Sequence, residues 1–503
     1  MSIVKVSVKW NKEVFKDIEV DTTMPPAVLK AQLFSLTNVP LERQKIMIKG
    51  QTIGDDTWGK VQLTNGLTLL LMGTAEAVPE LPAEKPKFLE DMTEQQIARA
   101  MQFPGGLKNL GNTCYMNATL QCLKSVPELR DSVKQFNISN QHRDGTQMII
   151  NALKTTYQQL DSNVDSIMPL TLLASIHREF PRFAEKDDHG HLMQQDANEF
   201  WVQMMQILQI NLPGIKEQQQ IANSIAASNT KSLVDQFFGI TVKATLKCDE
   251  APEEPPSISE ERLLQLSCFI SQDVKYMHTG LKNKLEEKIT KRSSTLDRDA
   301  QFTKITQLSR LPAYLTIQFV RFFYKDKQNV NAKILKDVQY SIILDVFDLC
   351  TPELQKRLMP VREKIKLSDD AKLERDRAKK LGETVVEPKN LSKLQTSFPD
   401  DAGSNNSGFY QLIAVLTHKG RSSSSGHYVA WVRRNQTEWL MFDDENVTVV
   451  LEEDVIKLSG GGDWHTAYVL IYGPRPVEIE EKDLSAGESS SNTTSLPTTA
   501  SST

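Results

Sequence analysis

Residues 106–117 read GLKNLGNTCYMN, and Cys114 lies where this tight, glycine-containing turn runs directly into a helix. After the cysteine, apolar residues recur at helical spacing as far as Leu123. We expect Asn112 or Thr113 to cap the first turn of this helix. The unpaired amides and the positive dipole end of a first helical turn favour a thiolate over a thiol. The pattern therefore predicts that Cys114 is a nucleophile.

A structural role is the commonest one for a free cysteine, because thiols pack well in protein cores. Cys122 fits that role, since it lies about two turns further along the same helix on an apolar face. The chain has an odd number of cysteines, without any C-x-x-C pair: they stand at positions 114, 122, 248, 268 and 350. We therefore expect reduced thiols, no structural metal and no cofactor.

Length and composition exclude several classes of protein. The 503 residues exceed one ordinary domain, and 39% hydrophobic with 24% charged residues is typical of a globular protein. No apolar run approaches the roughly 18 to 20 residues that span a bilayer, and the N-terminus lacks a signal-peptide pattern. The net charge of -5 gives no general attraction for nucleic acid. We expect a cytosolic or nuclear protein whose partners are proteins.

The first 73 residues have the pattern of a small β-grasp module. An alternating strand at 3–10 is followed by a hairpin partner at 14–20 and by a helix that begins at two prolines. The apolar stripe expected on this helix consists of Val28, Leu29, Leu33 and Leu36.

With residues 39–50, VPLERQKIMIKG, at its centre, this segment resembles a ubiquitin-like domain over 1–73. It has no free diglycine tail, so the resemblance implies docking and not conjugation. It places Met47 and Leu70 in the apolar patch through which such domains bind partners. The alternative is that both side chains pack in the core of the module.

Composition divides the rest of the chain. Residues 101–476 form the second domain, and five stretches are predicted to lie outside a packed core. They are a flexible linker at 74–100, a surface insertion near 214–231, an acidic and poorly ordered insertion near 249–261, a charged insertion at 353–393 that is either a solvated helix or mobile, and a disordered tail at 477–503.

A cysteine nucleophile needs a histidine base and a group that orients it. Residues 426–432, GHYVAWV, place His427 directly after glycine at the start of an apolar strand, and the next strand ends in Asp443 and Asp444. A hairpin can bring these carboxylates beside the histidine. We expect Asp443 to be the orienter, with Asp444 as the fallback, because alternation places only one of them on the histidine side.

The reaction also needs hydrogen-bond donors for an oxyanion, and removing one costs roughly 100- to 1000-fold in rate. The backbone amide of Cys114 is one donor. The side chain of Asn109 is the predicted second donor, if the glycine turn folds it back. An ordinary turn asparagine is the alternative.

Four segments in matching order resemble motifs of the ubiquitin-specific proteases over about residues 103–474. They are the cysteine box at 106–117, the glutamine-aspartate box QQDANEF at 194–200, LPAYLTIQ at 311–318 and the histidine box at 426–429 with 442–444. The resemblance implies an α+β protein with an N-terminal β-grasp ubiquitin-like domain and a papain-like domain of thumb, palm and β fingers. It implies a thiol protease that hydrolyses the isopeptide bond after the terminal glycine of ubiquitin, with Cys114 as nucleophile, His427 as base, Asp443 as orienter and Asn109 as oxyanion donor.

The same resemblance implies further contacts. Gln195, Asp196 and Ser424 would bind ubiquitin, although Asp196 is equally suited to be a helix N-cap. The loop at 420–426 would cover the channel for the tail of ubiquitin and act as a gate. With only Cys248 and Cys268 in the region of the fingers, those fingers would be metal-free.

The combination with a ubiquitin-like module resembles the proteasome-associated members of the family. It implies ubiquitin, ubiquitinated proteins and the regulatory particle of the 26S proteasome as partners, activation by docking, and a non-catalytic effect on the proteasome. Two other classes remain open from the sequence: a catalytically dead ubiquitin-binding adaptor and another papain-like acyl-transfer enzyme such as a transamidase. The Cys114, His427 and Asp443 set argues against the adaptor.

Overall fold

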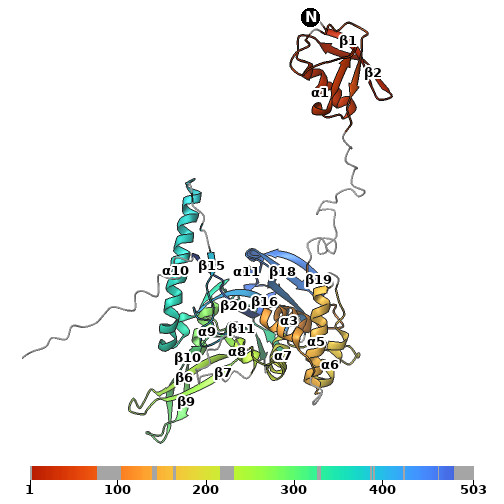
Figure 1. The fold of residues 1–503 in the computed structure, drawn as a ribbon. Helices are drawn as coiled ribbons and strands as arrows, with labels where there is room; N and C mark the ends of the chain where they lie inside the picture. Colours follow the sequence, from red (N-terminus) through yellow and green to blue (C-terminus); the bar gives the residue numbers. More distant parts are fainter. Residues whose placement is uncertain are drawn as a thin grey trace, which may run out of the picture. The chain divides into compact units, whose positions relative to one another are not determined.

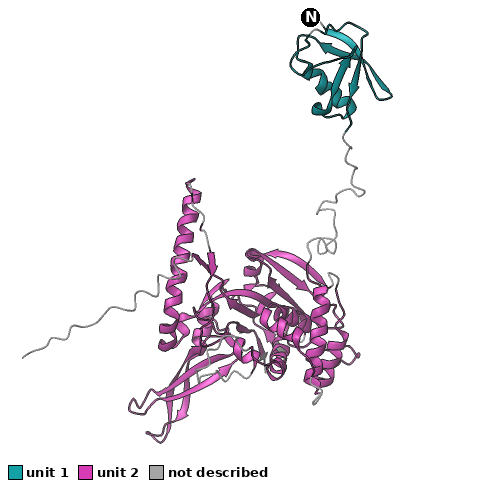
Figure 2. Ribbon diagram, in the orientation of Figure 1, with its two compact units in different colours: residues 1–88 teal, residues 89–503 magenta. Residues whose placement is uncertain are grey.

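The structure is a computed structural model, and the chain divides into two compact units, residues 1–88 and 89–503 (Figure 2). It describes residues 3–59, 61–75, 103–138, 144–162, 166–215, 232–325, 330–383, 385, 388, 391–422, 425–462 and 464–480. Most of the predicted linker, of the 214–231 insertion and of the tail therefore lies outside the described residues. Among the helices described, none is long and apolar enough to cross a lipid bilayer.

The first unit is a β-grasp fold, a five-stranded sheet in the order β2-β1-β5-β3-β4 with one long helix packed on it. Alternation along the strands buries one face, so that Val6, Val8, Ile46 and Leu69 form the core with Leu29 of the helix. The elements are β1 (Ile3–Trp10), β2 (Glu13–Asp21), α1 (Pro26–Thr37), η1 (Leu41–Arg43), β3 (Lys45–Ile48), β4 (Gln51–Thr52) and β5 (Thr68–Met72).

Helix α1 corrects the predicted apolar stripe. Leu29 and Leu33 are buried, but Val28 and Leu36 are 43% and 50% exposed. The reason is that a helix on a sheet buries one narrow face, and here the fourth-residue spacing places Lys30 and Thr37 on it. The prolines begin the helix as expected.

Met47 and Leu70 lie opposite each other on the outer face of the sheet, on β3 and β5. Leu70 is 42% exposed, whereas its neighbours Leu69 and Leu71 are buried. Leu70 therefore does not pack in the core of the module, and Met47 is half-buried beside it.

The second unit is built as a thumb, a palm and fingers. The thumb is helical, and its core joins all the helices through large side chains such as Trp201 and Phe200. Its elements are α3 (Cys114–Lys124), α4 (Pro127–Gln135), α5 (Gly145–Ser162), α6 (Leu170–Glu179), η3 (Pro181–Ala184), α7 (Ala197–Asn211) and α8 (Leu233–Phe238).

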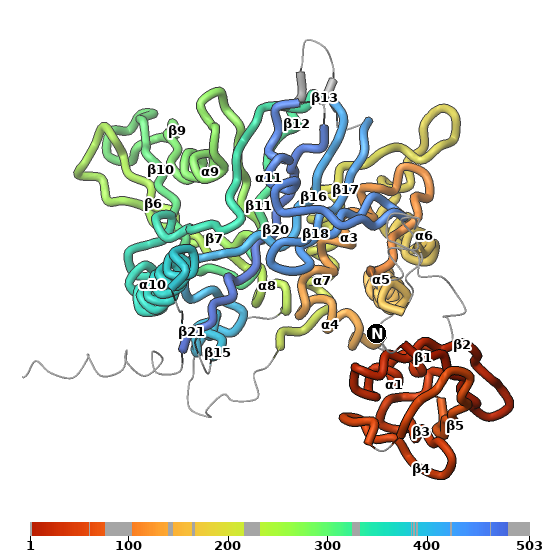
Figure 3. Tube along the Cα trace, turned by 90° about the horizontal axis from the view of Figure 1, so that it is seen from above, coloured from red at the N-terminus to blue at the C-terminus, as the bar shows by residue number. Residues whose placement is uncertain are grey.

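The palm is an eight-stranded sheet in the order β19-β18-β17-β16-β20-β11-β8, with β14 paired to β16. Figure 3 shows thumb and fingers at opposite ends of this sheet. The palm comprises β8 (Leu266–Phe269), β11 (Leu315–Val320), β14 (Ile343–Asp345), η4 (Phe347–Leu349), β16 (Phe409–Ser422), β17 (Ser425–Arg433), β18 (Glu438–Asp443), β19 (Asn446–Leu451), α11 (Glu452–Ile456), η5 (Lys457–Ser459) and β20 (Thr466–Pro474). A hairpin, β12 (Phe322–Lys325) with β13 (Val330–Lys333), follows β11.

The fingers are a four-stranded sheet, β7-β6-β10-β9, and they correct the prediction for 249–261. Part of that stretch is the edge strand β7 (Ser257–Leu263), which pairs along its whole length with β6 (Ile240–Cys248). The preceding acidic turn is ordered by its own carboxylates, because Glu250 accepts a hydrogen bond from the amide of Gln301 and Glu254 from Ser294. The other elements are α9 (Met277–Leu285), β9 (Glu286–Arg292) and β10 (Asp299–Arg310).

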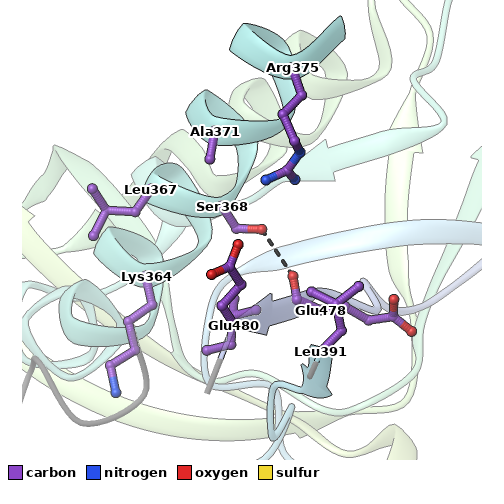
Figure 4. A pocket seen from close by; sticks show the side chains of 9 residues that line it. Lys364, Leu367, Ser368, Ala371, Arg375, Leu391, Glu478 and Glu480 are labelled. Carbon is purple, nitrogen blue, oxygen red and sulfur yellow. Dashed lines mark hydrogen bonds between the residues drawn. The ribbon is translucent and has the colours of Figure 1, made fainter. Parts of the chain in front are cut away.

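The charged insertion at 353–393 begins as one long helix, α10 (Pro352–Lys380), which projects from the body of the unit (Figure 1). Three of its side chains are buried, and the remaining face is solvated. Beyond it, β15 (Leu391–Lys393) pairs with β21 (Glu478–Glu480). The prediction of a disordered tail from 477 is thus wrong for its first residues, because Ile479 packs on α10 in a small core. Figure 4 shows the shallow pocket there, where Ser368 donates a hydrogen bond to the carbonyl of Glu478.

Candidate active site

Helix α3 begins at Cys114, which is 2% exposed. Gly111 and Asn112 adopt positive φ angles of 99° and 53°, which form the tight turn before the helix. Neither predicted cap is used, because the Thr113 side chain makes no cap hydrogen bond and Asn112 donates to the carbonyl of Leu192. The side chain of Thr113 therefore accepts no hydrogen bond from the backbone amides of the first turn, which is the turn that carries the Cys114 sulfur.

Asn109 fastens this turn. Its Oδ1 accepts from the amides of Gly111 (3.0 Å) and Thr113 (3.1 Å). Its Nδ2 donates to Oδ2 of Asp444 over 2.9 Å. An amide nitrogen carries two hydrogens, so one donor remains for another acceptor. The oxyanion role of Asn109 stays a prediction.

His427 and Asp443 lie on neighbouring strands of the palm, β17 and β18. Nε2 of His427 is 2.5 Å from Oδ1 of Asp443. The hydrogen bond to Asp443, together with the nearby Cys114, raises the pKa of His427 to about 10. The same hydrogen bond lowers the pKa of Asp443. Because Asp443 occupies Nε2, Nδ1 is the nitrogen left to face the sulfur, and the ring is an imidazolium at neutral pH.

Asp444 points to the other side and accepts amide hydrogens from Asn109 and from Asn117 of α3, at 2.9 and 2.8 Å. Its backbone carbonyl also accepts from the amide of Leu107 over 2.9 Å. Burial raises the pKa of Asp444. The structure thus places Asp443 on the histidine side, and Asp444 ties the cysteine turn to the palm.

Gln194 is a functional candidate that the sequence reasoning missed. Its Nε2 donates to the carbonyl of Gly426 over 2.6 Å and lies 3.7 Å from Sγ of Cys114. The sequence places two glutamines in succession, and nothing in the pattern says which one faces the cysteine. Gln195, the predicted ubiquitin contact, instead donates to the carbonyl of Arg182.

Asp196 is the N-cap of α7 and accepts from the amides of Asn198 and Glu199. The hydroxyl of Tyr468 donates to it over 2.8 Å. Burial raises the pKa of this carboxyl. The helix-cap alternative therefore describes its position in the free chain, and its contact with ubiquitin stays a prediction.

The predicted gate at 420–426 is described in part. Gly420 and Gly426 have φ angles of 134° and 144°. A side chain on Gly426 would clash with Lys419 and with the ring of His418, so the close approach requires glycine here. Ser424, a predicted ubiquitin contact, lies outside the described residues.

A family model of ubiquitin carboxyl-terminal hydrolases matches residues 105–472. The chain belongs to this family. It is 43% identical to ubiquitin carboxyl-terminal hydrolase 14 of Caenorhabditis elegans, over 94% of each chain. It is 39% identical to ubiquitin carboxyl-terminal hydrolase 6 of Arabidopsis thaliana, over 94% of this chain and 99% of the relative. The enzyme class is thus that of a cysteine-type deubiquitinase.

A solved structure shares the fold of this ubiquitin carboxyl-terminal hydrolase. It is the SAGA Ubp8/Sgf11/Sus1/Sgf73 DUB module bound to ubiquitin aldehyde, with a TM-score of 0.50, 20% identity, and coverage of 74% of this chain and 69% of the other. This likeness, with the family match, confirms the predicted papain-like fold class.

The other histidines near the hydrolase site are unsuited to serve as the base. His418 and His465 are buried on β16 and at the start of β20, and burial lowers their pKa values to about 3 and about 4. Both rings therefore hold a proton only weakly, whereas the pKa of His427 is raised, so His427 is the strongest base of the three.

Two groups of described residues contain side chains of the types that bind metal ions. The ligand atoms of His427, Asp443 and Asp444 lie within 4.8 Å of one another, but the hydrogen bonds described above already use them. Cys248 and Cys268 belong to separate hydrophobic clusters, one in the fingers and one in the palm. These two thiols do not form a shared ligand set.

Proposed function

We propose that this chain is a deubiquitinase that cleaves the isopeptide bond after the C-terminal glycine of ubiquitin on conjugated proteins, trimming chains and recycling ubiquitin. The observation that carries the proposal is the alignment of the α3 start, His427 and the 2.5 Å bond to Asp443. This set provides a cysteine nucleophile, a histidine with a raised pKa and an orienting carboxylate, as acyl transfer requires.

The first half of the reaction forms a thioester. The Cys114 thiolate attacks the carbonyl carbon of the last glycine, and the carbonyl electron pair moves to oxygen. The backbone amide of Cys114 and the free N–H of Asn109 are the proposed donors to this oxyanion. When the carbonyl re-forms, the C–N bond breaks, and the lysine amine leaves with the proton from Nδ1 of His427.

The second half uses the neutral His427 as a base. It takes a proton from water, which attacks the thioester carbon. Collapse of this second intermediate breaks the C–S bond, releases the carboxylic acid of ubiquitin and restores the thiolate and the imidazolium. The acid then loses its proton to solvent and becomes the carboxylate. Asp443 keeps the ring in place during both halves, since it accepts from Nε2 throughout.

Labelling with a ubiquitin C-terminal electrophile tests this assignment. Cys114→Ala is expected to abolish labelling, and Cys122→Ala is the matched control on the same helix. Cys122 is fully buried and burial raises its pKa well above that of a free thiol, so it should be inert. Labelling that survives in Cys114→Ala, or no labelling of the wild type, would contradict the proposal.

The substrate contacts proposed for this reaction are Gln195, Asp196 and Ser424. In the free enzyme Asp196 caps α7, and we propose that its carboxylate also contacts ubiquitin when the substrate binds. Replacement by Asn keeps a cap but removes charge, so a raised KM in Asp196→Asn would support a contact with the basic tail of ubiquitin.

We also propose that the ubiquitin-like unit docks on the regulatory particle of the 26S proteasome and that docking raises the hydrolysis rate, in the cytosol or nucleus. The supporting feature is the exposed Leu70 with the half-buried Met47 beside it, and Lys9 lies opposite Leu70 on β1. We further propose that binding of this chain changes the activity of the proteasome without any hydrolysis of ubiquitin conjugates.

Leu70→Asp should abolish binding to purified 26S proteasome and the accompanying rise in rate, whereas Val14→Asp should not. Both side chains are exposed on strands of the same unit, Leu70 by 42% and Val14 by 48%. Equal rates with and without proteasome in the wild type would refute activation by docking. Equal binding of the two variants would refute the patch.

A further inference from the structure

The first unit has a groove of about 210 Å³ between the edge of its sheet and its helix. Residues 19–21 of β2 form one wall, and Val28 and Leu29 of α1 lie on the other. Ile3 and Trp58 also line it. The groove is distinct from the Met47 and Leu70 patch, because β2 stands at the opposite end of the strand order from β3 and β4.

The backbone of β2 is available for pairing at this groove. Among the described strands of the unit, β2 has β1 as its one neighbour. On β1, Lys5 and Ser7 use their backbone groups toward β5, since the Lys5 carbonyl accepts from the amide of Gly66 and the Ser7 amide donates to Leu67, both over 2.8 Å. Backbone groups alternate in direction along a strand, so Val4 and Val6 of β1 face β2.

The partners of Val4 and Val6 on β2 are Val20 and Ile18. Glu19 lies between these two residues, and its N–H and C=O therefore point away from β1, to the free edge of the sheet. An edge strand that offers such a pair is a template for one more strand. Extended peptides commonly bind in this way, with main-chain hydrogen bonds to an edge and side chains in a neighbouring groove.

The side chains define what such a peptide contains. Ile3 and Val28 are 53% and 43% exposed, which is a large fraction for apolar residues that line a groove. The indole N–H of Trp58 is already donated to the carbonyl of Met24, over 2.7 Å. The ring thus offers the groove an apolar surface without a free donor.

The charge of the groove is acidic. Glu19 and Asp21 are its charged residues, and none of the described residues that line it is basic. Hydrogen bonds from Thr23 lower the pKa of Asp21, which is therefore ionised. Glu19 forms an exposed ion pair with Lys5 over 3.3 Å, and such a pair is weak in water. A cationic ligand is thus favoured over an anionic one.

We propose that this groove binds an extended peptide with apolar residues at alternate positions and a lysine or arginine beside them, which adds to β2 as an outer strand. The peptide exchanges two main-chain hydrogen bonds with Glu19. Alternate side chains enter the groove between Val20 and Val28, and the basic residue lies near Asp21. The unit therefore carries two independent docking surfaces.

The test uses the full chain and a fluorescein-labelled probe peptide, Lys-Thr-Val-Thr-Ile-Thr-Lys, in fluorescence anisotropy. Val28→Asp places a carboxylate in the groove and should weaken binding by about tenfold or more, because an unpaired charge would be buried against apolar side chains. Leu36→Asp is the matched control, since Leu36 is a similarly exposed apolar residue of α1 outside the groove.

Two control peptides separate the contributions of backbone and charge. Proline in place of the central Thr, which is the residue opposite Glu19, removes the main-chain donor to Glu19 and should abolish binding. Glutamate in place of both lysines should weaken it about tenfold, with an effect that shrinks as salt is added. Hydrogen exchange of the wild-type complex should show new protection in the peptide segment that contains Glu19.

No binding of the probe at millimolar concentration would overturn the proposal. So would equal affinity of Val28→Asp and Leu36→Asp, binding of the proline peptide, or protection that falls on another segment. Hydrolysis of a fluorogenic ubiquitin substrate by Val28→Asp should equal that of the wild type, which verifies the fold of the catalytic unit without bearing on the groove.

Discussion

Replacing Asp443 by alanine removes the carboxylate that is hydrogen-bonded to Nε2 of His427. The pKa of His427 rises from 6.5 to about 10 in the folded protein, mainly through this bond and secondarily through Cys114. Each pKa unit corresponds to about 1.4 kcal/mol of preference for the imidazolium. Because the His427 and Asp443 side chains are 32% and 41% exposed, solvent screens the pair, and we assign about 2 kcal/mol to the Asp443 bond.

That energy predicts a loss of roughly 30-fold in kcat/KM and a change in its pH profile. The imidazolium is present below the folded pKa and is lost as pH rises through it. Without Asp443 the folded pKa falls, so the alkaline limb of the profile should move down by about 1.5 pH units. The assay is hydrolysis of a ubiquitin C-terminal fluorogenic substrate from pH 6 to 10.

Two further variants separate orientation from charge. Asp443→Asn keeps an oxygen that accepts from Nε2, so it should retain more activity than Asp443→Ala while showing the same direction of change in the alkaline limb. Asp444→Ala should leave the alkaline limb in place, because Asp444 faces Asn109 and Asn117. An unmoved limb in Asp443→Ala, or a larger movement in Asp444→Ala, would refute the assignment.

Three other substitutions have defined outcomes. Gln194→Ala should lower kcat/KM about tenfold through the lost contacts with Gly426 and Cys114, and unchanged steady-state kinetics would contradict this. Gly106→Ala would place a Cβ 2.4 Å from the Glu445 carbonyl, so we expect about 2 kcal/mol of destabilisation, measured as a lower urea midpoint. Arg321→Met should destabilise by about 3 kcal/mol, because this buried guanidinium donates to four backbone carbonyls that would lose their donor; an unchanged urea midpoint would show that water replaces it.

Local patterns in the sequence predicted the parts of the site that are local in structure. The turn before Cys114 and the strand that carries His427 follow from helix starts and apolar alternation. Alternation also predicts that only one of Asp443 and Asp444 faces the histidine, but it does not say which one. The contacts of Asp444 with Asn109 and Asn117 could not be predicted, because they join positions more than 300 residues apart and depend on how α3 seats against the palm.

Errors in the fold have equally physical causes. The acidic composition of 249–261 indicated disorder, but strand β7 is stabilised by pairing with β6 and has no need of an apolar face of its own. On α1, Val28 and Leu36 match a helical apolar stripe by type, yet only the sheet decides which of the apolar residues face it. Gln194 and Gln195 are adjacent and identical in type, so the sequence does not indicate which of them points at the Cys114 sulfur.

The adjacent residues Asp443 and Asp444 hold the two halves of the site from opposite faces of one strand end. Asp443 grips the histidine of the palm, and Asp444 grips the turn and the helix that carry the cysteine of the thumb. The distance between nucleophile and base is therefore set through the peptide unit that joins Asp443 to Asp444, and a peptide unit is planar and rigid. A movement of the thumb against the palm elsewhere along their interface would leave that distance unchanged. A ligand that separates them far from the site should therefore slow the entry of substrate before it slows the chemical step.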